Sequence, residues 1–145
     1  QLKLAIQHIR GEIGIIEKSS SVYQTEAWGN TDQAPFSNQV ILVQTEKNAQ
    51  EVLRILLAIE KKMGRKRVIK WEPRVIDLDI LFYDSLLVDE QNLVIPHPHL
   101  HERRFTLVPM AEISENFIHP KFNKTILELL ESCTDGLLVE KISIK

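Results

Sequence analysis

The sequence has 145 residues, of which 43% are hydrophobic and 26% are charged, and its formal net charge at pH 7 is −2. These values indicate one soluble domain, residues 1–145, and they exclude the broad basic surface of a nucleic-acid-binding protein. No apolar run is long enough to cross a membrane. Because Cys133 is the only cysteine, an internal disulfide is excluded, and we expect a reducing, cytoplasmic compartment.

Apolar residues recur at helical spacing over residues 2–13, which predicts an amphipathic helix that ends near Gly11 or Gly14. Residues 15–23 have the pattern of a strand. Residues 24–35 then form a long loop rich in turn residues, and a loop of that length suggests a functional role.

Residues 36–45 are predicted to form a second strand, in which Phe36, Asn38, Val40 and Leu42 share one face. Phe36 and Asn38 then stand side by side, as an aromatic plate next to a carboxamide. Such a pair could stack on and hydrogen-bond a flat heterocycle. A core phenylalanine beside an asparagine that binds a loop is the more common alternative.

The next predicted element is a helix that begins after Asn48, a good N-cap residue, and stops at Gly64. Glu60 lies at the edge of its apolar stripe, and its simplest interpretation is an ion pair with Lys61 or Arg65. The stripe consists of Val52, Leu53, Leu56, Leu57, Ile59 and Met63.

Two carboxylates, Asp77 and Asp79, interrupt the β-type apolar run of residues 71–84. In a strand, residues two apart point to the same face with Cα atoms roughly 6.5 to 7 Å apart. Oxygen ligands suit Mg²⁺, which binds one or two carboxylates together with substrate phosphates. A solvated face with two ordinary acids explains the same spacing equally well. The opposite face is wholly apolar and should be core: Ile76, Leu78, Ile80 and Phe82.

Five cations precede this acidic pair within ten residues: Arg65, Lys66, Arg67, Lys70 and Arg74. Cations beside paired acids suggest a divalent metal and a polyphosphate in one site, because arginine forks bind the phosphate oxygens that the metal bridges. An isolated basic cluster would instead be a solvated turn.

Beyond Asp84, residues 86–88 could pair back as a short hairpin strand, and residues 89–92 form a polar loop. His97, His99 and His101 alternate, but prolines flank His97 and no fourth ligand is near, so we do not expect zinc. The remaining predicted elements are a helix or turn at 105–113, a helix at 124–132 and a strand at 136–144. Cys133 is expected to be a buried helix residue. This order fits an α+β sandwich on a mainly antiparallel sheet.

Several separated motifs resemble those of the 6-hydroxymethyl-7,8-dihydropterin pyrophosphokinase family, from about Ser21 to Glu112. They are Gly64-Arg-x-Arg, Lys70-Trp71-x-Pro73-Arg74-x-x-Asp77-x-Asp79, and Ile95-Pro96-His97-Pro98 with Arg103 and Phe105. The resemblance implies a ferredoxin-like fold with helices on both faces of the sheet. It also implies that the family's N-terminal strand is missing from this sequence.

The implied activity is transfer of pyrophosphate from MgATP to the hydroxymethyl group of the reduced pterin, which yields AMP and the pterin diphosphate in folate biosynthesis. It implies two Mg²⁺ ions held by Asp77 and Asp79, with ATP as co-substrate. The expected partners are these small molecules, with no nucleic acid and no membrane, and the expected protein is a monomer.

The resemblance also implies a role for individual residues. The catalytic set is Arg65, Arg74, Asp77 and Asp79. The ATP-binding set is Glu60, Arg67, Lys70, Trp71, Ile80, His97 and Arg103. The pterin-binding set is Thr25, Glu26, Ala27, Trp28, Phe36, Asn38 and Phe105, although the family often has prolines at the places of Glu26 and Ala27. His99, His101 and Arg104 are expected at the surface.

Two other function classes remain open. A metal-dependent nuclease also uses paired acids near a basic residue, but it would leave the Phe36, Asn38 and Phe105 pocket idle and would need a wider basic face. A non-catalytic ferredoxin-like binding module would leave the clustered acids and arginines without purpose. Release of AMP from ATP that requires both Mg²⁺ and the pterin separates the three.

Overall fold

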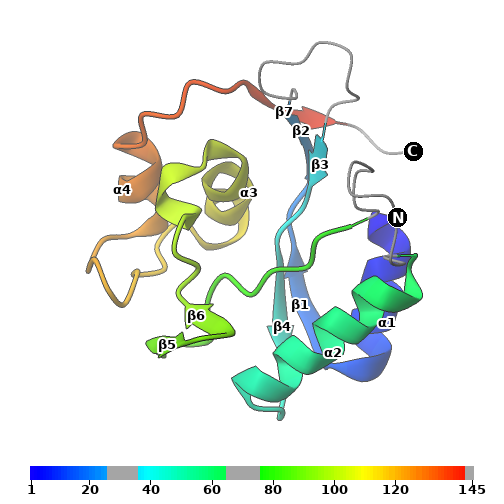
Figure 1. Cartoon of the computed structure of the whole chain (residues 1–145). Helices are drawn as coiled ribbons and strands as arrows, with labels where there is room; N and C mark the ends of the chain where they lie inside the picture. Colours follow the sequence, from blue (N-terminus) through cyan, green and yellow to red (C-terminus); the bar gives the residue numbers. More distant parts are fainter. Residues whose placement is uncertain (26–35, 65–75, 143–145) are drawn as a thin grey trace.

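The computed structural model describes residues 1–25, 36–64 and 76–142 of the chain. Antiparallel strands form a middle layer, with α1 (Leu2–Glu12) and α2 (Ala49–Lys62) on one side and α3 (Arg104–Ser114) and α4 (Ile126–Glu131) on the other (Figure 1). Separate hydrophobic clusters fill the two sides of this layer. The α+β class predicted from the sequence is therefore confirmed, while the ferredoxin-like strand order stays a prediction.

The middle layer is built on a hairpin that is broken in the middle of both arms. β1 (Ile15–Ser19) pairs with β4 (Ile41–Gln44), and β2 (Val22–Thr25) pairs with β3 (Phe36–Asn38). At the break, the Ser20 N–H donates to the Val40 carbonyl (2.8 Å), and the Ser20 hydroxyl oxygen accepts from the Val40 N–H (2.9 Å). Both predicted strands are thus confirmed, but each is divided in two because a side chain replaces a ladder carbonyl.

The C-terminal strand β7 (Val139–Ile142) pairs antiparallel with β2 on the edge opposite β3. It confirms the strand predicted at 136–144, within shorter bounds. The strand β2 is therefore held on both edges, by β3 and by β7.

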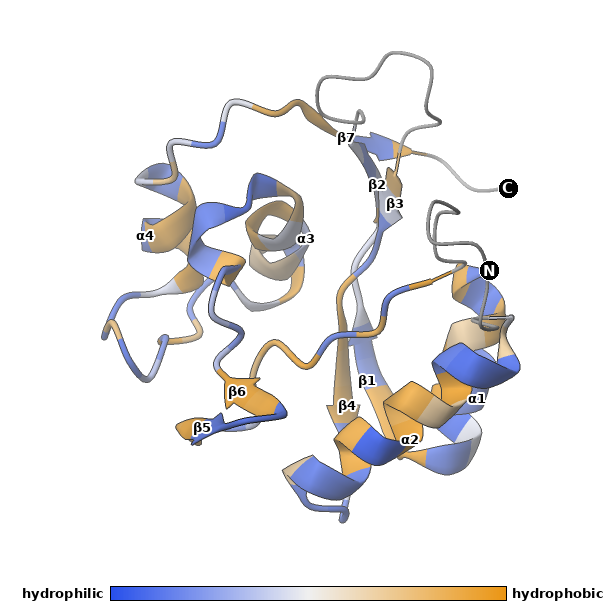
Figure 2. Cartoon of the chain, viewed as in Figure 1, coloured by the Kyte–Doolittle hydropathy of each residue, from blue (hydrophilic) through white to orange (hydrophobic). Residues whose placement is uncertain are grey.

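The helix α2 begins as predicted, because the Asn48 side chain accepts a hydrogen bond from the Glu51 N–H (2.9 Å). Its buried stripe packs against α1 and against Ile41 and Val43 of β4. Leu57 is 50% exposed, so its predicted place in the stripe is wrong. Both hydrophobic and hydrophilic residues colour α2, whereas β4 is hydrophobic along most of its length (Figure 2).

The strand predicted at 71–84 is wrong for the part that the structure describes, because residues 76–83 belong to no β-ladder. Ile76, Leu78 and Ile80 pack with α2, and the alternation with the two acids is visible in Figure 2. Leu81 and Phe82, however, both pack against the α3 and α4 cluster. The segment crosses from one helix layer to the other, so its single apolar face does not persist.

A short hairpin follows this crossing segment, formed by β5 (Val88–Glu90) and β6 (Leu93–Ile95). The prediction that residues 86–88 pair back on the preceding segment is therefore wrong, since β5 pairs with the strand that comes after it. After β6 and a 3₁₀ turn, η1 (Leu100–Glu102), the chain enters α3, which confirms the helix predicted at 105–113.

The helix predicted at 124–132 is confirmed as α4, which starts with a reciprocal capping box between Thr125 and Glu128. Cys133 follows the end of α4 and is only partly buried, so its prediction as a buried helix residue is wrong. None of the helices in the described ranges is long and apolar enough to span a membrane.

A close approach between the turn after α1 and the end of β4 explains Gly14, since a Cβ there would overlap the Gln44 carbonyl oxygen. We expect Gly14→Ala to lower the free energy of unfolding by about 1–3 kcal/mol, the usual cost of overpacking. Gly11 is the matched control, because it lies in α1 and a Cβ there would meet no atom within 4 Å. Gly11→Ala should stabilise by about 0.5–1 kcal/mol. Urea denaturation measures both, and equal effects would contradict the contact.

Candidate active site

The two acids lie on a backbone that is tied to α2. Asp77 and Asp79 are exposed, while Leu78 between them packs into the α2 cluster. The Leu78 N–H donates to Oε2 of Glu60 (2.7 Å), a residue of the last helical turn that is 3% exposed. This arrangement turns both aspartate side chains away from the core, as the spacing predicts.

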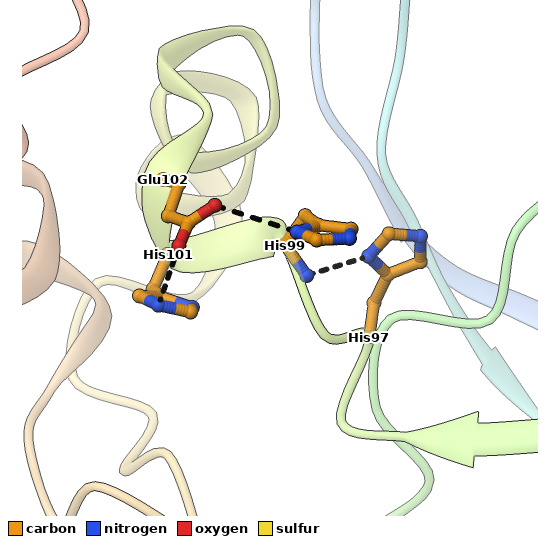
Figure 3. Close-up of polar contacts among 4 residues, drawn as sticks. All are labelled: His97, His99, His101 and Glu102. Carbon is orange, nitrogen blue, oxygen red and sulfur yellow. Dashed lines mark hydrogen bonds and ion pairs between the residues drawn. The ribbon is translucent and has the colours of Figure 1, made fainter.

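His97 follows β6 and has a defined tautomer. Its Nδ1 accepts a hydrogen bond from the His99 N–H (3.2 Å), so the neutral ring carries its proton on Nε2 (Figure 3). The backbone N–H of His97 donates to the carbonyl of Leu81 (2.9 Å), which fixes the histidine loop beside the segment that carries the acids.

Three residues of the predicted site interact through their charges around His97. Burial lowers the pKa of His97, the negative charge of Asp79 raises it, and the positive charge of Arg103 lowers it further. The net effect is a pKa below the ordinary value, so His97 is neutral at pH 7. Its Nε2–H is then a neutral hydrogen-bond donor, since Nδ1 already accepts from the His99 N–H.

The other two histidines of this stretch share a carboxylate instead. His99 Nδ1 lies 3.4 Å from Oε2 of Glu102, and His101 Nε2 lies 3.5 Å from Oε1 of the same residue (Figure 3). Neither of these two pairs includes His97, Asp77 or Asp79. His99 is exposed, whereas His101 is partly buried. The predicted surface position is therefore fully confirmed for His99 and only partly for His101.

Arg103 and Phe105 flank the first residue of α3. The guanidinium carbon of Arg103 lies 5.6 Å from the centroid of the Phe105 ring, within range of a cation–π interaction. The Arg104 N–H donates to Oδ2 of Asp135 (3.0 Å). An aspartate from the C-terminal segment therefore caps this helix, a contact that the sequence analysis missed because the two residues are far apart in the chain.

Three of the residues predicted to bind pterin, Thr25, Phe36 and Asn38, lie on paired strands. Thr25 at the end of β2 is the register partner of Phe36, and Tyr23 is the register partner of Asn38. Phe36 is 53% exposed, so its ring is available to a ligand. The helix α3, which carries Phe105, packs against both strands.

The donor set fits a hard cation that keeps part of its coordination for substrate. Within residues 1–25, 36–64 and 76–142, no group of three His, Cys, Asp or Glu side chains could hold a metal. Asp77 and Asp79 supply two exposed carboxylates, and Mg²⁺ typically uses one or two carboxylates and completes its shell with phosphates and water.

Eight predicted site residues lie outside the described ranges, and their roles stay predictions. They are Glu26, Ala27 and Trp28 of the first loop, and Arg65, Arg67, Lys70, Trp71 and Arg74 of the basic cluster. Glu60 and Ile80 are described, and their side chains are directed into the core. A contact between ATP and either of these two also stays a prediction.

A comparison with protein families matches residues 1–115 to the 7,8-dihydro-6-hydroxymethylpterin-pyrophosphokinase family. The chain belongs to this family. All residues of the predicted site, from Thr25 to Phe105, lie within the matched range. The family resemblance inferred from the separated motifs is therefore confirmed.

Curated relatives from distant organisms carry the pyrophosphokinase name. The chain is 40% identical over 121 residues to 2-amino-4-hydroxy-6-hydroxymethyldihydropteridine pyrophosphokinase of Synechocystis, covering 82% of this chain and 62% of the relative. It is 42% identical over 113 residues to the enzyme of that name from Aquifex aeolicus, covering 78% and 71%. It is also 37% identical over 133 residues to a folic acid synthesis protein of Pneumocystis carinii, covering 92% of this chain and 17% of that protein.

A polar lock, formed by Glu112 with Ser21 and Tyr23, joins α3 to the start of β2 beside the residues predicted to bind pterin. The Glu112 carboxylate accepts hydrogen bonds from the Ser21 N–H (3.0 and 3.1 Å), the Ser21 hydroxyl (2.8 Å) and the Tyr23 hydroxyl (2.6 Å). The sequence carries no signal for it, because the partners are about ninety residues apart and none is chemically unusual. It fixes the helix of Phe105 against the strand that pairs with Asn38.

Both partners of this lock have shifted pKa values. Burial and the bond to Glu112 raise the pKa of Tyr23 to about 12. Burial alone would raise the pKa of Glu112, but its bonds from Tyr23 and Ser21 outweigh that effect and lower it. The Glu112 contribution to stability is present above the unfolded value of 4.5 and is lost as the pH falls through the folded pKa, whereas the Tyr23 contribution is lost as the pH rises from 10 towards 12.

We therefore expect Glu112→Gln to move the pKa of Tyr23 from about 12 towards its ordinary value of 10. Absorbance at the tyrosinate band measures it, and Tyr83→Phe assigns the signal because the chain has two tyrosines. The loss of stability in Glu112→Gln should shrink at acid pH, where Glu112 is protonated. Glu115→Gln, on an exposed neighbour of the same helix end, is the control. An unchanged Tyr23 titration in Glu112→Gln would contradict the lock.

Proposed function

We propose that this chain transfers pyrophosphate from MgATP to the hydroxymethyl group of 6-hydroxymethyl-7,8-dihydropterin, with AMP and the pterin diphosphate as products. One observation carries the proposal: the backbone N–H of His97 binds the Leu81 carbonyl (2.9 Å), which places this histidine beside the segment of Asp77 and Asp79 in a member of this family. The names of the Synechocystis and Aquifex relatives support the same reaction. Because the chain spans 62% of the first of these relatives, the activity is proposed for the whole protein.

The phosphate half of the site begins with the two acids. Asp77 and Asp79 would hold two Mg²⁺ ions, which when bound would neutralise charge on the phosphates of ATP. Both side chains are exposed, so they can bind ligands from solvent without any change in the core packing. The core packing of Leu78 keeps them on the solvent side, which limits the reorganisation needed when the substrate binds.

Nitrogen donors would bind the remaining phosphate oxygens. His97 offers a neutral Nε2–H because its Nδ1 is already an acceptor, and Arg103 offers a charged guanidinium. The partly buried Ile80 side chain packs against the core, so its contact with ATP would use backbone groups. Arg65 and Arg74 would stabilise the transferring group and the leaving AMP, while Arg67, Lys70 and Trp71 would anchor the nucleotide.

The pterin half would lie over β2 and β3. Phe36 and Phe105 would stack on the two faces of the ring, and Asn38 would hydrogen-bond its polar edge. Thr25 supports this placement, because its Oγ1 is buried without a hydrogen-bond partner among the described residues. Glu26, Ala27 and Trp28 would complete the pocket.

The proposal includes the finer predictions of a ferredoxin-like sandwich and a cytoplasmic monomer that acts on small molecules. The decisive assay is AMP release from ATP by the whole protein, with and without Mg²⁺ and with and without the hydroxymethyl pterin. The proposal requires AMP only when both are present. AMP release without pterin, or nucleotide release from DNA or RNA, would overturn it, and no release would favour a binding module.

Replacing either acid should abolish transfer and leave the fold intact. We expect Asp77→Asn or Asp79→Asn to lower turnover at least ~10²-fold, comparable to the loss of one preorganised electrostatic group. Asp84→Asn is the matched control, because Asp84 is exposed in a turn at φ 49°, where asparagine is equally tolerated. A loss of only a few-fold in the Asp77 or Asp79 variants at saturating Mg²⁺ would contradict the metal assignment.

Pterin recognition should separate from nucleotide binding. Phe36→Ala and Phe105→Ala each remove stacking worth roughly 0.5 to 1.5 kcal/mol beyond the buried area. Asn38→Leu should cost more, about 1 to 3 kcal/mol, because a buried polar edge of the ligand loses its partner. Calorimetry with pterin and a non-hydrolysable MgATP analogue measures these effects.

The control for the pterin variants is the affinity of the analogue alone, which should stay unchanged in all three. Phe122→Ala, on an exposed ring between α3 and α4, should change neither affinity. Equal weakening of nucleotide binding would show that the three residues are core supports, and the pterin half of the proposal would fail.

A further inference from the structure

We propose that Glu60 is a positioning residue, which sets the direction of the Asp77 and Asp79 carboxylates by holding the backbone N–H of Leu78 between them. The inference rests on the proposed function in one respect, namely that these two acids bind the metal and the phosphates. It differs from the predicted direct contact between Glu60 and ATP, because here the carboxylate acts through the protein backbone.

The geometry of Glu60 is that of a buried anchor. Its carboxylate lies in the last turn of α2 beside Ile59, which is 0% exposed, and Glu60 itself is 3% exposed. Its Oε2 accepts the Leu78 N–H at 2.7 Å, at the short end of the range for bonds to an ionised group. A carboxylate in this position costs desolvation, which such a hydrogen bond offsets.

The acidic segment needs an anchor because no ladder holds it. Residues 76–83 have no strand partner among the described residues. Leu78 is the residue that stands between the two acids in the sequence. The Leu78 side chain packs with α2, and its N–H is bound by the same helix. Since the peptide group is planar, fixing that N–H also fixes the carbonyl end of Asp77.

The chain is therefore fixed at the one residue that lies between the two metal-binding side chains. A helix is a more rigid support than a loop, and residues that orient metal ligands in this way typically change metal affinity or activity about 10- to 100-fold when they are replaced. Glu60 would act as such an orienting group without touching the metal or the nucleotide.

Three variants test the inference on the whole protein. Glu60→Leu keeps the buried volume and removes the acceptor, Glu60→Gln keeps a neutral acceptor, and Glu51→Ala changes an exposed acid on the same helix as the matched control. The first readout is the NMR resonance and the hydrogen exchange of the Leu78 amide, measured on protein without metal or nucleotide. The second is Mn²⁺ binding in the presence of ATP, measured by electron paramagnetic resonance.

We expect Glu60→Leu to expose the Leu78 amide to exchange and to weaken Mn²⁺ binding about 10- to 100-fold, while ATP affinity without divalent metal stays unchanged. Glu60→Gln should restore most of the Mn²⁺ affinity, with a Leu78 resonance shifted by loss of the charge. If Glu60→Leu does not fold, a shifted Leu78 resonance in Glu60→Gln, with Mn²⁺ affinity slightly below that of the wild type, still supports the inference.

Two results would overturn the inference: an unchanged Leu78 amide, or a loss of metal-free ATP affinity, which would show a direct contact with the nucleotide. Failure of the proposed function is a separate result. If the wild-type protein transfers no pyrophosphate but the Leu78 and Mn²⁺ changes occur, the positioning role stands and the reaction does not.

Discussion

The hydrogen bond between the Glu60 carboxylate and the Leu78 N–H is the contact on which the arrangement of the site depends. The segment that carries Asp77 and Asp79 crosses between two helix layers without joining a sheet, so no ladder sets its direction. Its position comes from side chains packed on both sides and from a few hydrogen bonds to elements distant in sequence. One of those, from the His97 N–H to Leu81, brings the histidine loop beside the acids.

The two halves of the proposed site are supported by different parts of the fold. The acids and His97 depend on α2 and on the loop after β6, whereas Phe36 and Asn38 depend on the far end of the broken hairpin. Helix α3 connects the halves, because Arg103 and Phe105 flank its start and Glu112 binds β2 from its last turns. Phosphate binding and pterin binding can therefore be altered separately, while a change in α3 affects both.

Local signals predicted the elements whose causes are local. The Asn48 cap, most of the buried stripe of α2 and the helix at 124–132 follow from neighbours within one or two turns, and the structure confirms them. The break in the hairpin was not predicted, because the Ser20 hydroxyl resembles any exposed serine until Val40 lies opposite. The run after Asp79 also misled, since a strand with one apolar face and a crossing chain with core on both sides have similar sequences.

The sequence by itself determined the family, the α+β class and the identity of the chemical groups, because acids, arginines and aromatic residues at fixed spacings are visible without a fold. It also predicted that Asp77 and Asp79 point away from the core that Leu78 faces. Only the tertiary structure decided what holds these groups in place. Glu60, Asp135 and Glu112 make their contacts across 18, 31 and about ninety residues, and such pairings arise from the packing of whole elements rather than from any local preference of the chain.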